Sequence, residues 1–201
     1  MSQAADVSRE TLDKLSRYAE VLKKWNPSIN LVAKSTIEDL WSRHILDSLQ
    51  VMEHIPSNTA HLVDLGSGGG FPGLVIALAA HEGGNPAKVT MIESDQRKSV
   101  FLRTVLRETS VAASVITDRI EAVAPQGANV LTARALADLN TLLGFAERHM
   151  ASDGVALFLK GRNWRKELVE AQKFWQFEWS EIQSKTSDEA ILLKVQGVKR
   201  V

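Results

Sequence analysis

The stretch VDLGSGGGFPG, from Val63 to Gly73, decides the predicted fold, because five of its eleven residues are glycines and it lies between two regular segments. The residues that lead into it, HLVDL at 61–65, are typical of a buried strand, and residues 72–80 have the pattern of a helix. Glycines at such a junction let a ligand approach the backbone closely. We therefore expect a ligand-binding loop at the end of the first strand of an α/β sheet.

The glycines of this loop can be read in two registers. Gly68 to Gly73 match G-x-G-x-x-G, the pattern of dinucleotide-binding loops. Asp64 to Gly70 match acidic-x-G-x-G-x-G, which resembles the loop with which Rossmann-like methyltransferases hold S-adenosylmethionine. A carboxylate at position 64 favours the second register, since it would repel a diphosphate and attract a sulfonium or an α-amino group. Pro72 also favours it, because a proline in the first helical turn removes an N–H donor that a diphosphate would use. The simpler alternative is a tight turn that Asp64 caps.

Composition limits the classes of protein that the chain can form. Its 201 residues, 44% of them hydrophobic, suffice for one substantial core. The longest apolar run, Leu74 to Ala80, is too short to cross a membrane, and Met1 to Glu10 lacks the apolar core of a signal peptide, so we expect a cytoplasmic protein without a membrane partner. The absence of cysteine excludes disulfides, thiolate metal sites and cysteine nucleophiles. A net charge of zero disfavours non-specific coating of nucleic acid but allows a local basic patch.

Periodicity along the chain predicts the arrangement of helices and strands. Apolar residues at three- and four-residue spacing predict a first helix that stops at Asn26-Pro27, and a second that begins in a capping box at Ser35–Glu38 and ends at Pro56. From His61 onward, β-rich runs alternate with helical patterns, which is typical of right-handed crossovers and a mostly parallel sheet. The runs are 61–65, 88–93, 113–117, 129–133 and 155–160, and the helical patterns are 72–80, 95–109, 138–150 and 164–175.

The end of the chain predicts an antiparallel edge on this sheet. Residues 177–183 and 189–197 read as strands, and the turn-rich segment between them is too short for a crossover helix. The predicted architecture is therefore a Rossmann-like α/β fold of the class I methyltransferase type. It consists of a helical N-terminal cap at residues 1–57 and the Rossmann-like domain at residues 58–201.

Two acidic residues follow the second predicted strand. Glu93 stands where an acidic side chain accepts hydrogen bonds from ribose hydroxyls, and the insertion HEGGNPA stretches its spacing from the glycine loop. Asp95 stands at the N-cap of the following helix, a role that Glu93 could also fill. We assign Glu93 to the ribose and Asp95 to the cap, which predicts a nucleoside ligand without choosing between the two cofactor classes.

Several motifs in order along nearly the whole chain resemble the ribosomal small-subunit methyltransferase G family, also called glucose-inhibited division protein B. These motifs are WN…NLVA, RHILDSL, DLGSGGGFPG, KSVFLR, RIEA, ARAL and LFLKGR. The resemblance implies transfer of a methyl group from S-adenosylmethionine to N7 of a specific guanine in 16S ribosomal RNA. The implied partner is 16S RNA or the small-subunit ribonucleoprotein particle, and we expect the protein to be a monomer.

The resemblance also implies roles for particular residues. Gly66 and Phe71 match the family's glycine-loop contacts to the cofactor, Ile120 and Glu121 match a pair beside the adenine, and Arg134 matches a cofactor-contacting arginine. In physical terms an arginine at that strand end can pair with the methionine carboxylate, although the apolar members could equally be core residues. The predicted cofactor-binding residues are Gly66, Gly68, Phe71, Glu93, Ile120, Glu121 and Arg134. This loop has Gly69 where relatives often have proline and Glu93 where aspartate is frequent.

Two further segments supply candidates for the catalytic pocket. In RHILDS, Arg43 and Asp47 are spaced to form an ion pair on one helical face, with His44 on the apolar side; we expect this helix to border the pocket. In KGRNWRK, Lys160 and three further cations surround Trp164 at the end of the fifth strand. Such a run is usually a solvated face, but at the ligand edge of a sheet it is as well suited to contact RNA backbone.

The residues that the chain lacks bear on the target atom. Methylation of a pyrimidine at carbon-5 needs a cysteine nucleophile, and methylation of an exocyclic amine usually needs an Asn/Asp-Pro-Pro-aromatic loop; the sequence has neither. Guanine N7 carries no proton, so its methylation needs only placement and electrostatics, and we predict no catalytic acid or base and no metal. A methyltransferase for another substrate and a non-catalytic nucleotide-binding regulatory module remain the alternatives.

Overall fold

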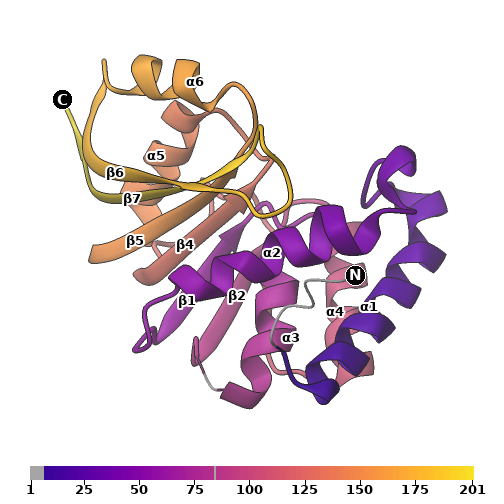
Figure 1. The fold of residues 1–201 in the computed structure, drawn as a ribbon. Coiled ribbons are helices and arrows are strands. Elements are labelled where there is room, and N and C mark those ends of the chain that lie inside the picture. The colour runs from indigo at the N-terminus through magenta and orange to yellow at the C-terminus, as the bar shows by residue number, and fades with distance from the viewer. Residues whose placement is uncertain (1–6, 84) are drawn as a thin grey trace.

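The computed structural model describes residues 7–83 and 85–201 and has the predicted class I architecture (Figure 1). Within these residues one seven-stranded sheet has the order β3-β2-β1-β4-β5-β7-β6. Strands β1 to β5 pair in parallel, and β7 pairs antiparallel with both β5 and β6, as the sequence predicted for the edge. The strands are β1 (His61–Leu65), β2 (Lys88–Ile92), β3 (Ser114–Ile116), β4 (Ala128–Arg134), β5 (Met150–Lys160), β6 (Trp175–Gln183) and β7 (Ile191–Arg200).

Helices cover both faces of the sheet (Figure 1). One layer contains α1 and the short helical turns that follow it, together with α3 and α4, and the other contains α5 and α6. The α-helices are α1 (Arg9–Ile29), α2 (Asp47–Leu49), α3 (Gly73–Gly83), α4 (Gln96–Thr109), α5 (Leu139–His149) and α6 (Trp164–Ala171). No helix among the described residues is long and apolar enough to cross a membrane.

Alternation along the strands explains why the sheet is buried on both faces. Leu62 of β1 belongs to the core on the α1, α3 and α4 side, whereas its neighbours Val63 and Leu65 belong to the core under α5 and α6. Buried residues of α1, such as Leu15 and Leu22, belong to the first of these cores. The cap helix α1 thus packs on helices α3 and α4 and shares their core, and the division at residue 57 stays a prediction.

Helix α1 continues past the point where the sequence predicted its end. It contains Pro27 and ends at Ile29, with Asn30 in the left-handed C-cap conformation. The Asn26 side chain is buried and accepts a hydrogen bond from the backbone N–H of Val32 at 2.9 Å. This bond ties down the segment after the helix, so the last turn is held by tertiary contacts in spite of the proline.

The second predicted helix is irregular, and its capping box does not form. A 3₁₀ turn at Lys34–Thr36 precedes the π-helix η2 (Trp41–Leu46), which runs into α2 and then into a 3₁₀ helix at Gln50–His54. Thr36 instead donates its hydroxyl to the carbonyl of Ala33 and contacts the ring of His44. A π-helix in this position is typical of a functional site, because wider turns redirect the side chains that they carry.

The N-cap of α4 confirms the sequence prediction, whereas the extent of the last helix corrects it. Asp95 caps α4 through the N–H groups of Arg97 and Lys98. Asp138 caps α5 in the same way. Helix α6 ends at Ala171, and Trp175, predicted as its last residue, begins β6 instead. Trp175 is buried and donates its indole N–H to Asn140 of α5. This tertiary contact, rather than the helical pattern of the sequence, decides that Trp175 lies in a strand.

Candidate active site

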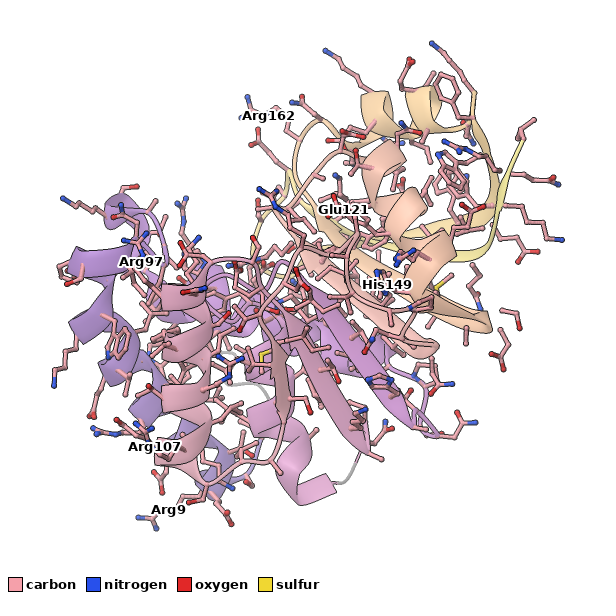
Figure 2. All side chains as sticks on the ribbon, turned by 180° about the vertical axis from the view of Figure 1, so that it is seen from behind. Arg9, Arg97, Arg107, Glu121, His149 and Arg162 are labelled. Carbon is pink, nitrogen blue, oxygen red and sulfur yellow. The ribbon has the colours of Figure 1, made fainter. Side chains whose placement is uncertain are left out.

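The main cavity, of about 470 Å³, opens at the carboxyl ends of the parallel strands. It is lined by all seven residues that the sequence predicted to bind a cofactor: Gly66, Gly68, Phe71, Glu93, Ile120, Glu121 and Arg134. They come from the loops after β1, β2, β3 and β4, so four crossovers meet here. In Figure 2 Glu121 lies toward this end of the molecule, whereas Arg107 and Arg9 lie at the opposite end of the helical layer.

The glycine loop forms one wall of the cavity. Gly66 and Gly68 have φ angles of 61° and 53°, in the left-handed region that favours glycine. A Cβ at Gly66 would lie 2.5 Å from Cδ1 of Leu136, which is another lining residue. The loop is held from outside by the hydroxyl of Tyr18, which donates to the carbonyl of Gly69 at 2.5 Å. The glycines thus present backbone to the cavity, and Ser67 and Phe71 are the loop residues with side chains that line it.

Asp64 supports the loop from below and does not line the cavity. Its side chain is fully buried and accepts hydrogen bonds from the hydroxyls of Ser67 and Thr132, at 2.6 and 2.7 Å. Burial raises the pKa of Asp64 to about 6, although these hydroxyls and the N–H of Gly73 oppose the shift. The contacts of Asp64 are therefore those of the simpler alternative, in which it caps the loop.

Glu93 joins the glycine loop to the second strand. One carboxylate oxygen accepts from the N–H of Gly68 at 2.7 Å, and the other accepts from the N–H of Asp95 at 2.8 Å. The residue is 7% exposed and lines the cavity. Each oxygen keeps acceptor capacity on the cavity side, so the geometry suits a vicinal pair of hydroxyl groups.

Arg134 connects the end of β4 to the π-helix. Its guanidinium pairs with Asp47 at 3.2 Å, donates to Nδ1 of His44 at 2.7 Å and lies 4.8 Å from the ring centre of Phe71. The predicted ion pair between Arg43 and Asp47 does not form among the described residues. The arginine from β4 has taken its place, because the wider π-helical turn aims Asp47 at the sheet, while Arg43 is exposed and contacts Arg134 through its backbone carbonyl.

His44 is neutral in this arrangement. Burial, followed by the charges of Arg134 and Arg43, lowers the pKa of His44 to about 4. Because Nδ1 accepts from Arg134, the proton lies on Nε2, which donates to the hydroxyl of Thr36 at 2.9 Å. Neither His44 nor Asp47 lines the main cavity; both reach it through Arg134.

The wall opposite the glycine loop is held by helix α5. His149 is fully buried and its Nε2 donates to the carbonyl of Ile120 at 2.9 Å, while Arg148 donates twice to the carbonyl of Val123. Thr141 and Phe145 of the same helix line the cavity. The sequence reasoning missed this helix as part of the site; its amphipathic pattern was the same as that of any core helix.

The basic run KGRNWRK at the end of β5 is less exposed and less strongly cationic than the sequence predicted. Lys160 is buried, forms an ion pair with Glu167 and donates to the carbonyl of Ala137 at 3.0 Å. Trp164 is also buried, so it offers no stacking surface to RNA. Two other cations of the run are paired on the surface, Arg162 with Glu189 and Arg165 with Glu181. Acidic residues distant in the sequence thus neutralise much of the predicted patch.

Solved methyltransferase structures share this fold. A TehB-like S-adenosylmethionine-dependent methyltransferase from Corynebacterium glutamicum has a TM-score of 0.58 and 13% identity, covering 90% of this chain and 98% of that chain. TYW2 of M. jannaschii, solved in complex with AdoMet, has a TM-score of 0.54 and 13% identity, covering 77% of each chain. The fold and the glycine-loop cavity at its strand ends define a Rossmann-like class I methyltransferase.

Sequence comparison gives the family. Residues 11–191 match the GidB family, described as rRNA small subunit methyltransferase G. The protein named "Ribosomal RNA small subunit methyltransferase G" of Ruegeria sp. (strain TM1040) is 54% identical over 98% of this chain and 95% of its own length. The protein of the same name from Gluconobacter oxydans is 49% identical over 97% and 98%. This chain belongs to the rRNA small subunit methyltransferase G family.

Proposed function

We propose that this protein transfers a methyl group from S-adenosylmethionine to N7 of one guanine in 16S ribosomal RNA. The observation that carries the proposal is the cavity at the strand ends, which all seven predicted cofactor residues line, in a chain of this family. RNA is the substrate class that the names of the relatives give. We propose further that the protein acts as a monomer in the cytoplasm.

The residues around the cavity fit S-adenosylmethionine, which supplies an electrophilic methyl group when bound. Glu93 has acceptor capacity for the two ribose hydroxyls. Ile120 offers an apolar surface for the adenine beside the exposed Glu121. Arg134, held by Asp47 and His44, is a fixed cation for the methionine carboxylate. The bare backbone of the glycine loop leaves room for the rest of the molecule.

The chemistry of guanine N7 suits the side chains of this site. The N7 lone pair is nucleophilic and unprotonated at neutral pH, so the enzyme has to orient the base in line with the methyl group and exclude water. His44, which contacts Arg134 and Phe71 of the cavity wall, has a pKa of about 4 and its imidazole nitrogens are both engaged. It has no free nitrogen with which to act as a general base.

The product offers a direct test of this proposal. 7-Methylguanosine has a fixed positive charge, so RNA that contains it is cleaved at that nucleotide after borohydride reduction and aniline treatment. We expect incubation of the protein with S-adenosylmethionine and unmethylated small-subunit particles, or the RNA extracted from them, to produce one aniline-sensitive guanine in 16S RNA.

Two outcomes would contradict the proposal. Methyl incorporation without scission would place the methyl group on another atom. Cofactor binding without any methyl transfer to naked RNA or particles would favour a methyltransferase of another substrate or a regulatory module.

A further inference from the structure

A second cavity, of about 400 Å³, adjoins the main cavity. The two share the wall Ala135–Ala137, which follows β4 directly. The other side of the second cavity is formed by the end of β5, the turn after it and Glu167 of α6. A base in this cavity would therefore lie next to whatever occupies the main cavity.

The shared wall is strained at one residue. Ala135 has a φ of 51°, in the left-handed region that residues with a Cβ rarely adopt. It is exposed, and it lies between Arg134, which lines the main cavity, and Leu136, which lines both. Strain of this kind persists where the surrounding structure imposes it, and it is concentrated at ligand sites.

The carboxylate of Glu167 is the group in the second cavity with unused hydrogen-bonding capacity. Its Oε2 accepts the N–H of Leu139 at 2.9 Å and pairs with Lys160. Among the described residues, no donor contacts Oε1. A carboxylate has about four acceptor positions, so two are used here and two remain. The side chain is 26% exposed and lines the second cavity.

We propose that the second cavity holds the target guanine and that Glu167 recognises its Watson–Crick edge. This inference rests on the proposed function. Guanine presents two adjacent donors on that edge, N1–H and the N2 amino group, and they match the two free acceptor positions of Glu167. The N7 atom is on the opposite side of the purine from that edge, and the two cavities meet at Ala135–Ala137, so a base held by its Watson–Crick edge can present N7 to the main cavity.

Glu167 also acts on the transition state. Methylation leaves a positive charge on the purine, and this charge strengthens N1–H and N2–H as hydrogen-bond donors. A carboxylate fixed by Lys160 and the N–H of Leu139 therefore binds the base more tightly as the methyl group is transferred, which is the condition for acceleration. Adenine would present an N1 lone pair to the same carboxylate and would be repelled.

The first test changes the base and leaves the protein intact. Aniline scission first locates the target guanine. A 16S RNA ligated from fragments then carries inosine at that position. Inosine keeps N7 and N1–H but lacks the N2 amino group. We expect kcat/KM of the wild-type protein to fall by roughly tenfold to a hundredfold, the usual effect of losing a hydrogen bond to a charged group. Equal rates on guanine and inosine would overturn the assignment.

The second test exchanges specificity. In Glu167→Gln the amide oxygen keeps the two donors Leu139 N–H and Lys160, so the NH2 group faces the cavity; it can donate to N1 of adenine but cannot accept from N1–H and N2–H of guanine. We expect the preference for guanine over adenine at the target position to fall by at least about tenfold. The matched control is Glu170→Gln, which removes an exposed acid of the same helix that pairs with Lys173, and it should keep the wild-type preference. A slower Glu167→Gln variant with unchanged preference would show a structural role only.

The outcomes separate this inference from the proposed function. If wild-type protein gives no aniline-sensitive guanine on unmodified RNA, the proposed function is wrong. If it does, and neither inosine nor Glu167→Gln changes the rate or the preference as expected, then only the role of Glu167 is wrong. Should Glu167→Gln fail to fold, the inosine comparison with the wild-type protein still decides.

Discussion

At Gly73, the first residue of helix α3, the chain has no room for a side chain. A Cβ there would lie 2.5 Å from both Cβ and Oδ2 of Asp64, the buried residue that holds the glycine loop. We expect Gly73→Ala to lower the free energy of unfolding by about 1–3 kcal/mol, because the added methyl overpacks the core and displaces Asp64. Urea unfolding would measure this loss.

Gly144 provides the control for that substitution. It lies inside α5, and a Cβ there would approach Trp175 only to 3.8 Å, which is an ordinary contact. Gly144→Ala should leave stability unchanged or raise it by up to about 1 kcal/mol, since alanine is the better helix former. Equal losses in the two variants would show that the close approach to Asp64 does not matter.

Arg134 is the residue whose removal best tests the cofactor site. Arg134→Ala should weaken S-adenosylmethionine binding by about 1–3 kcal/mol, because the methionine carboxylate would lose a charge-assisted hydrogen bond. Titration calorimetry measures the change. The control is Arg103→Ala, an arginine of α4 that donates to Val115 and Thr117 away from the cavity, and it should keep the wild-type affinity. If Arg134→Ala keeps its affinity and only turnover falls, the arginine serves the RNA or the transition state.

At the scale of elements, helix α1 supports the glycine loop although none of its residues lines the main cavity. Its Tyr18 hydroxyl donates to the carbonyl of Gly69. Tyr18→Phe keeps the ring contacts with Phe71 and Phe101 but leaves that buried carbonyl unpaired, at a cost of about 1–3 kcal/mol in stability. We expect cofactor affinity to fall with it, because the loop loses a tether.

Thr104→Val serves as the comparison for this hydroxyl. Thr104 donates its hydroxyl to the carbonyl of Val100 within α4. Loss of this hydroxyl therefore affects the helical layer of α1, α3 and α4 but removes no contact with the glycine loop. Calorimetry and urea unfolding of both variants separate the two effects. Tyr18→Phe would contradict the tether if it lost stability to the same degree as Thr104→Val and kept full cofactor affinity.

The elements that sequence periodicity predicted well are those stabilised by their own pattern. Strands β1 to β4 and helices α4 and α5 have strong apolar repeats, and Asp95 and Asp138 mark the two helix starts. Strand β5 begins at Met150, which the sequence assigned to the preceding helix. The prediction for the RHILDS segment was wrong. Its apolar repeat predicted an ordinary helix, whereas the structure has a π-helix, whose register depends on Arg134 reaching Asp47 and His44 from a strand far along the chain.

At the scale of the whole molecule, the titration of the histidines predicts how the rate depends on pH. Burial lowers the pKa of each histidine whose side chain the structure describes: His44 to about 4, and His54, His61 and His149 below their ordinary value. A lowered pKa means that each is already neutral at pH 7 and loses no proton as the pH rises.

Single-turnover methyl transfer should therefore show a nearly flat pH profile above about pH 7, since guanine N7 also has no proton to lose. Rapid-quench measurements with saturating cofactor would check this. Alanine at His44 or His149 should not introduce a requirement for higher pH, whatever it does to packing. A rate that rises tenfold per pH unit above neutrality would require a general base that the described histidines do not supply.

The sequence by itself determined the class of fold, the position of the glycine loop and, partly through the family resemblance, seven of the residues that line the main cavity. The fold and the loop follow from local patterns: strand and helix periods, and glycines and an acid directly after strands whose carboxyl ends meet at one edge. Only the tertiary structure decided the partners of the charged groups. Asp47 pairs with Arg134 rather than Arg43, Lys160 is buried against Glu167, and His149 holds the Ile120 wall. Asp47 and Arg134 lie 87 residues apart in the sequence, and His149 and Ile120 lie 29 apart. The energy of a buried charge depends on which partners folding brings within a few ångströms.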